Sequence, residues 1–83
     1  MIENTIDEIV LYPNPVVNYV ELQNMDNTKD YIIHLFNADG RLLETVDINQ
    51  INVYRLEYPF LPGTYLLKLN SQKSMKTFRF VVF

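Results

Sequence analysis

The 83-residue chain contains no cysteine and no tryptophan, and it has a single histidine and two glycines. Without cysteine there is no disulfide to staple the fold and no thiol to do chemistry. One histidine and no cysteine do not supply the usual ligand set of a zinc site within one chain. Two isolated glycines do not form a glycine-rich loop that cradles phosphate. The inventory therefore argues against an enzyme.

Long apolar runs, basic clusters and helical periodicity are also missing. No run approaches the ~20 apolar residues that a membrane-spanning helix needs. The net charge is −3, and the seven basic residues are spread along the chain, which argues against a nucleic-acid-binding protein. No window repeats apolar residues at the i, i+3, i+4, i+7 spacing of an amphipathic helix. The expected elements are therefore strands.

Short runs rich in Val, Ile, Leu, Tyr and Phe, separated by turn residues, make up the chain. Its 48% of hydrophobic residues suffices for one core in one domain. These runs are typical of β-strands, and we expect strands at residues 6–12, 16–23, 31–36, 41–48, 51–58, 64–70 and 75–83. About seven short strands at roughly ten-residue spacing predict an all-β fold, an Ig-like antiparallel β-sandwich of the Greek-key type.

Alternation of apolar and polar residues within the runs predicts which face of each strand is buried. The expected core consists of Val20, Leu22, Ile33, Leu35, Tyr54, Leu56, Tyr65, Leu67, Leu69, Phe78, Phe80 and Val82. The opposite faces carry Glu21, His34, Arg55, Lys68 and Arg79. Because a shift of one residue would bury these polar groups, the strand register is expected to be well specified.

Proline and glycine mark three sharp turns. Tyr12-Pro13-Asn14-Pro15 holds the chain extended and removes two backbone donors, which suits a rigid corner crossing from one sheet to the other; a docking epitope of the polyproline kind is the alternative. Asp39-Gly40 between two apolar runs predicts a β-hairpin. Pro62-Gly63 matches a type II turn. The hydroxyl of Tyr65 is then expected to reach nearby backbone, as in the tyrosine corner of Greek-key sandwiches.

Few residues suggest catalysis or metal binding. His34 lies in the middle of a predicted strand, where a surface or half-buried side chain is favoured over a ligand or a general base. Ser71 and Ser74 lack the context of an activated nucleophile. The loop that contains Asp26 and Asp30 has oxygen ligands, but their spacing matches no calcium-binding pattern, so a solvated loop is favoured over a calcium site. We expect no catalytic residue, metal site or cofactor.

Four elements occur in an order that resembles one known family. They are YPNP before a strand, IIHLFNADGRLLET, FLPGTYLLKL, and KTFRFVV near the end of the chain. Over residues 9–82 the chain resembles the type A C-terminal sorting domain of the type IX secretion system, found at the end of surface and secreted proteins of Bacteroidota. The motifs of that family correspond here to Tyr12, Pro13, Asn14, Pro15, Gly40, Arg41, Gly63, Tyr65, Lys76 and Arg79.

The resemblance implies a non-enzymatic signal that directs a larger cargo protein to the cell surface or the medium. The implied partners are the outer-membrane translocon, a sortase that removes the tail, and the cargo domain that precedes it in the same polypeptide; no nucleic acid and no cofactor is implied. Residues 1–8 are then a linker from the cargo or an added N-terminal tail, and residues 9–83 are the sorting domain. The apolar last strand predicts strand addition by a receptor and a hazard of edge-to-edge self-association.

A carbohydrate-binding or adhesive β-sandwich module is the alternative. Such a module usually presents a planar row of exposed aromatic side chains. Tyr19, Tyr31, Phe36 and Tyr58 are the candidates for that row. The alternation does not place them clearly on one face, so the sequence favours the sorting domain.

Overall fold

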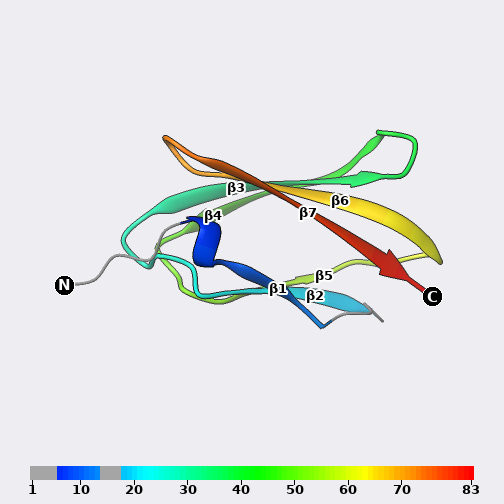
Figure 1. Cartoon of the computed structure of the whole chain (residues 1–83), viewed down its shortest axis with the longest axis horizontal. Helices are drawn as coiled ribbons and strands as arrows, with labels where there is room; N and C mark the ends of the chain where they lie inside the picture. The colour runs from blue at the N-terminus through cyan, green and yellow to red at the C-terminus, as the bar shows by residue number, and fades with distance from the viewer. Residues whose placement is uncertain (1–5, 14–17) are drawn as a thin grey trace.

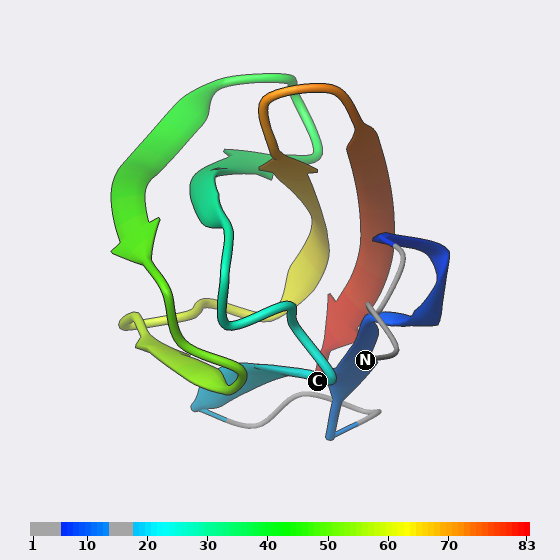
Figure 2. The ribbon, with the colours of Figure 1, turned by 90° about the vertical axis from the view of Figure 1, so that its left-hand side faces the viewer.

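Two antiparallel sheets packed face to face form the structure, a computed structural model that describes residues 6–13 and 18–83 (Figures 1 and 2). The elements are η1, a 3-10 helix (Ile6–Glu8), β1 (Val10–Tyr12), β2 (Tyr19–Gln23), β3 (Asp30–Asn37), β4 (Leu42–Asn49), β5 (Tyr54–Glu57), β6 (Gly63–Asn70) and β7 (Met75–Val82). Every paired strand among the described residues is antiparallel. The predicted all-β sandwich is confirmed.

The strands divide between a three-stranded sheet, in the order β1-β2-β5, and a four-stranded sheet, in the order β4-β3-β6-β7. β3 and β4, and likewise β6 and β7, are adjacent in the larger sheet, whereas the connections after β2, β4 and β5 cross between the sheets. An Ig-like sandwich has its strands A, B and E in one sheet and C, F and G in the other, with a further strand beside C. The observed order agrees with that arrangement and leaves the C-terminal strand at a sheet edge.

The core lies between the sheets and follows the predicted alternation. Along β6, Tyr65, Leu67 and Leu69 are buried, and the residues between them are half-buried. All predicted core residues are buried except Tyr54 and Phe78, which are half-buried and pack against the core. The polar residues predicted on the opposite faces are half-buried or exposed. A period of two is thus the pattern that a strand with one buried face imposes on its sequence.

Among residues 6–13 and 18–83, two fully buried core residues lie outside the strands. Ile9, between η1 and β1, and Met25, in the crossover after β2, are almost completely buried. The backbone N–H of Met25 donates a hydrogen bond to the carbonyl oxygen of Asn52 at 2.9 Å. This bond joins the crossover after β2 to the crossover after β4.

The first predicted strand, residues 6–12, is shorter than expected. Its beginning is η1, in which the N–H of Ile9 donates to the carbonyl oxygen of Ile6 at 3.3 Å. Residues i and i+3 of a 3-10 turn lie on the same side, so Ile6 and Ile9 both reach the core, which a strand would not allow. The turn also overlaps the segment 1–8 that the sequence suggests as a linker, and its Ile6 packs on the folded domain.

The fifth predicted strand, residues 51–58, is also shorter, because β5 begins at Tyr54. β4 and β5 belong to different sheets, so the chain needs residues between them to cross from one sheet to the other. Ile51 and Val53 lie in that crossover and are exposed. Their apolar side chains led to the prediction of a strand, but residues that cross between the sheets do not pair with a neighbouring strand.

Candidate recognition surface

β7 lies at the edge of the four-stranded sheet, and within the described part of the chain β6 is its one strand partner. Phe80 and Val82 are buried, whereas Arg79 and Val81 are exposed on the outer side. Phe83 follows the strand with 87% of its surface exposed. Figure 1 shows β7 running to the C-terminus. The end of the chain therefore combines open backbone with exposed apolar and cationic side chains.

The segment that enters the domain is held against β7. η1 lies beside the strand (Figure 2), and the Lys76 ammonium donates a hydrogen bond to the carbonyl oxygen of Ile9 at 2.9 Å. The same ammonium lies 5.0 Å from the ring centroid of Phe78. Of the two basic residues predicted near the end of the chain, Lys76 is thus engaged inside the domain, while the Arg79 side chain is exposed.

The proline-rich corner joins neighbouring strands of one sheet. Tyr12 ends β1 and lies opposite Glu21 of β2, so the predicted crossing between sheets at this corner is wrong. The Tyr12–Pro13 peptide bond is cis, and about half of the Tyr12 surface is exposed on the outer face. Asn14 and Pro15 lie outside the described residues.

The predicted hairpin at Asp39-Gly40 is confirmed. The N–H of Asn37 donates to the carbonyl oxygen of Arg41 at 3.0 Å, and the N–H of Gly40 donates to the carbonyl oxygen of Asn37 at 3.0 Å. The Asn37 side-chain oxygen accepts from the N–H groups of Asp39 and Arg41. Gly40 has a φ of 83°, the left-handed conformation that glycine adopts in three-residue hairpin loops. The Arg41 side chain is left exposed at the tip.

Tyr65 forms the predicted tyrosine corner. Its hydroxyl donates to the carbonyl oxygen of Leu61 at 2.6 Å and accepts from the Leu61 N–H at 3.0 Å. Its ring stacks on Phe80 and meets Phe60 edge-on, with centroids 5.6 and 5.0 Å away. Gly63 has a φ of 150° instead of the roughly 80° of a type II turn, so that turn type is wrong: Gly63 already begins β6. Gly63 and Tyr65 shape the corner between the sheets.

The residues considered for chemistry have structural partners. His34 is half-buried, with Nδ1 3.3 Å from the side-chain nitrogen of Asn70. Asp26 was predicted in a solvated loop, and this is wrong, because only 5% of its surface is exposed. Its Oδ1 accepts from the Thr28 hydroxyl at 2.6 Å and the Thr28 N–H at 2.9 Å, and these bonds hold the pKa of the Asp26 carboxyl below its usual value. Within residues 6–13 and 18–83, no group of three acidic, His or Cys side chains is placed to hold a metal ion.

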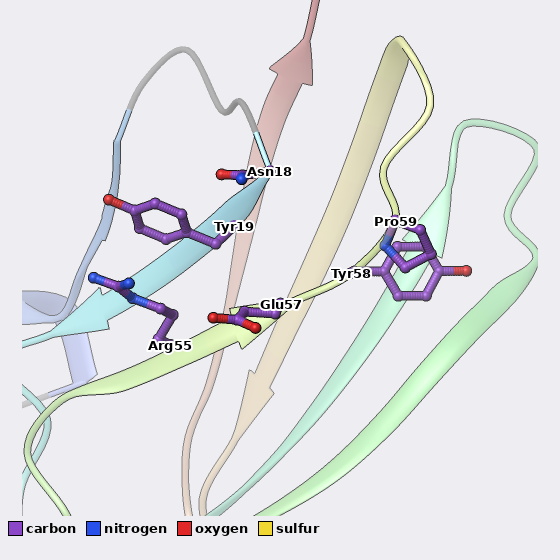
Figure 3. Close-up of a pocket in the computed structure, with 6 residues that line it drawn as sticks. All are labelled: Asn18, Tyr19, Arg55, Glu57, Tyr58 and Pro59. Atoms are coloured by element: carbon purple, nitrogen blue, oxygen red, sulfur yellow. The ribbon is translucent and has the colours of Figure 1, made fainter.

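An open groove runs from the ribbon of β2 and β5, where it is lined by Tyr19 and Arg55, to the chain just after β5, where it is lined by Tyr58 and Pro59 (Figure 3). Its lining residues are Asn18, Tyr19, Arg55, Glu57, Tyr58 and Pro59. The Arg55 guanidinium lies 4.1 Å from the centroid of the Tyr19 ring and donates from Nε and Nη2 to Glu21 Oε2, each at 3.3 Å. The Gln23 side-chain amide donates to the other Glu21 oxygen at 2.7 Å. The Gln23 bond, and after it Arg55, lower the pKa of Glu21.

Sequence reasoning missed this groove as a unit. Its walls come from two strands that pair in space but are more than thirty residues apart in the chain, as the Glu21–Arg55 pair shows with a separation of 34. The available signal was the alternation, which placed Glu21 and Arg55 on outward faces without showing that these faces adjoin.

The four aromatic candidates for a sugar-binding row do not lie together. Tyr31 is buried, and its hydroxyl accepts from the Asp26 N–H at 3.1 Å. Phe36 belongs to the other sheet, with the Lys68 ammonium 5.4 Å from its ring centroid. Tyr19 and Tyr58 both line the groove. No planar row of all four exists, although two of them share one site.

In the part of the chain that the structure describes, no helix has the length and hydropathy to cross a bilayer.

A comparison with known protein families identifies the family of the chain. The family model that matches the chain is described as a secretion system C-terminal sorting domain, and the match covers residues 10–83, from the start of β1 past the end of β7. No curated protein matches the chain. Domains of this family are not enzymes; they belong to larger cargo polypeptides that interact with the type IX machinery, which implies export to the cell surface or the medium. The chain belongs to the family of C-terminal sorting domains of the type IX secretion system.

Proposed function

We propose that the domain is read by the outer-membrane translocon through its last strand, and that a sortase then removes it from the cargo. The observation that carries the proposal is the position of β7 at the border of the larger sheet, with exposed Val81 and Phe83 at its end. An exposed strand edge offers unpaired N–H and C=O groups along its length. A receptor segment that adds as a strand would bind these groups and use the outward side chains for specificity.

The contact region is confined to the end of β7. Its beginning is beside η1, and Lys76 is bonded to the Ile9 carbonyl oxygen there. The residues from Arg79 to Phe83 lie beyond that contact and carry an exposed guanidinium and exposed apolar groups. We therefore assign the recognition contact to Arg79 rather than to Lys76.

The other motif residues divide by exposure. Tyr12 and Arg41 have exposed side chains and are candidate contacts. Gly40 and Gly63 with Tyr65 fix the hairpin and the corner, and Pro13 ends β1. Their substitution would weaken recognition by the translocon indirectly, by changing the shape of the domain. Asn14 and Pro15 complete the motif in the family, and we keep them as predicted recognition residues.

The sortase cut is proposed to lie N-terminal to Ile6. Ile6 packs against the core, and Ile9 is fully buried. A protease needs an extended segment in its active site, so a cut between these residues would require the domain to unfold locally. A cut before them would release the cargo and leave the sandwich intact.

The test is a fusion of residues 1–83 behind a signal peptide and a fluorescent reporter, expressed in a cell with a working type IX system. The reporter is expected outside the cell, and expected to stay inside when the system is disabled. Retention of the wild-type fusion in a competent cell would refute the sorting role of this domain.

The role of β7 is tested by Arg79→Glu and by deletion of Phe83, which leave the buried side chains of the strand in place. Lys73→Glu is the matched control, because Lys73 is exposed in the turn before β7. Both β7 variants are expected to reduce secretion several-fold, with the control unchanged and all three folded by circular dichroism. Wild-type secretion of both β7 variants would show that the translocon reads another surface.

A further inference from the structure

The groove where the start of β2 lies beside the end of β5 plays no part in the sorting proposal. Its lining residues belong to β2, β5 and the residues next to them, whereas β7 borders the other sheet. Its volume of about 440 Å³ falls within the roughly 300–1,000 Å³ of small-ligand sites. We propose that this groove binds a short neutral saccharide.

The polar groups of the groove match hydroxyl groups. Arg55 uses Nε and Nη2 for Glu21, and its guanidinium has further N–H donors. The Glu57 carboxylate is exposed and has no side-chain partner among the described residues, so it is an open acceptor. The Asn18 amide both donates and accepts. Each sugar hydroxyl is also both a donor and an acceptor, so this mixed set satisfies it in either role.

The aromatic rings supply apolar surface for the C–H face of a sugar ring on the sides that Arg55 and Phe60 do not cover. Tyr19 and Tyr58 line the same groove with Pro59, and Figure 3 shows Tyr19 on one side of Glu57 and Tyr58 with Pro59 on the other. Arg55 lies over the Tyr19 ring at 4.1 Å. Tyr58 packs against Phe60 with ring centroids 5.2 Å apart.

The site is ordered before a ligand arrives. Gln23 bonds Glu21, Glu21 bonds Arg55, and Arg55 covers one face of Tyr19. Side chains that are already fixed lose less rotamer freedom on binding, and this lowers the free-energy cost of complex formation.

The charges favour a neutral ligand. Glu21 compensates Arg55, so Glu57 leaves the lining with a net negative charge that disfavours acidic sugars. A proline-rich peptide also docks in aromatic grooves. Its backbone offers mainly carbonyl acceptors, however, and would leave the Glu57 carboxylate without a donor.

The test is an NMR titration of the isotope-labelled 83-residue chain with maltotriose, mannotriose and chitotriose. Saturable amide shifts are expected at residues 18–19 and 55–59 with at least one sugar, with a dissociation constant on the order of 1 mM for so open a site. Glu57→Gln should weaken binding roughly 3- to 10-fold, because the amide oxygen still accepts a hydrogen bond but without the charge that strengthens it. Asp47→Asn, which removes an exposed carboxylate from the other sheet, should leave binding unchanged.

Any one of three results would overturn the proposal. The first is no saturable shift with any of the three sugars at about 20 mM, some twenty times the expected dissociation constant. The second is sugar binding that Glu57→Gln leaves unaltered, and the third is tighter binding of a proline-rich peptide than of any sugar. The saccharide site is separable from sorting, because the reporter fusion carrying Glu57→Gln should be secreted like the wild type.

Discussion

Tyr65→Phe removes one oxygen atom from the corner between β5 and β6 and leaves the ring in place. The lost hydroxyl makes two hydrogen bonds with the backbone of Leu61, at 2.6 and 3.0 Å. Each such bond contributes about 0.5–1.5 kcal/mol net, so the free energy of unfolding should fall by about 1–3 kcal/mol. The stacking of the ring on Phe80 and its edge contact with Phe60 are retained, so no cavity adds to the loss.

Urea unfolding followed by circular dichroism at pH 7 measures this loss. The slope of the unfolding free energy against urea should be unchanged, because the variant exposes the same surface on unfolding. A domain of this size shifts its Tm by roughly 4–8 °C per kcal/mol. A loss of about 2 kcal/mol therefore lowers Tm by roughly 8–16 °C, a large change for a domain whose total stability is on the order of 5–15 kcal/mol.

Tyr54→Phe is the matched control. Tyr54 is half-buried against the same core, and its hydroxyl has no hydrogen-bond partner among the described residues. Its loss should change the free energy of unfolding by less than about 0.5 kcal/mol. The tyrosine corner would be refuted as a stabilising feature if Tyr65→Phe cost no more than this control.

Two further predictions concern the loops. The hydrogen bonds from Thr28 lower the folded-state pKa of Asp26, so its contribution to stability is full above the unfolded value of about 3.9 and is lost as pH falls through the folded value. The stability difference between the wild type and Asp26→Asn should accordingly shrink in urea titrations below about pH 4, and a difference that stays constant with pH would contradict this. In Gly40→Ala the new Cβ meets no atom within 4 Å, so the free energy of unfolding should fall only by the cost of holding alanine in the left-handed conformation, roughly 1–2 kcal/mol. Gly40→Asn should lose less, because asparagine adopts this conformation more readily. Equal melting temperatures of the wild type and Gly40→Ala would contradict the assigned turn.

The elements that the sequence predicted well are those whose cause is local. Strands β3, β6 and β7 begin and end within one residue of their predicted limits, because alternation has the period of the strand itself. The hairpin at Gly40 follows from a turn that only glycine accommodates easily. The Tyr65 corner spans four residues, from Leu61 to Tyr65. Each of these features is decided within a short stretch of chain.

Two of the predictions that failed concern placement relative to the other sheet. The corner at Pro13 was expected to cross between sheets, but β1 and β2 pair within one sheet. Asp26 was expected in solvent, but the crossover after β2 turns it inward beside Tyr31. Neither outcome is encoded in the few residues around these positions, because each depends on where the other sheet lies.

The sequence by itself determined most of the strands and their buried faces, the hairpin, the tyrosine corner and the family. Tertiary structure alone decided that Lys76 is engaged with Ile9 while Arg79 is exposed, and that Tyr19, Arg55 and Glu57 share one groove with Tyr58. Periodicity reports which side of a strand meets the core. The contact between residues 34 positions apart arises when β2 pairs with β5, and the contact between residues 67 positions apart arises when β7 meets the segment before β1. Both depend on the assembly of the whole domain and not on the residues nearby in the chain.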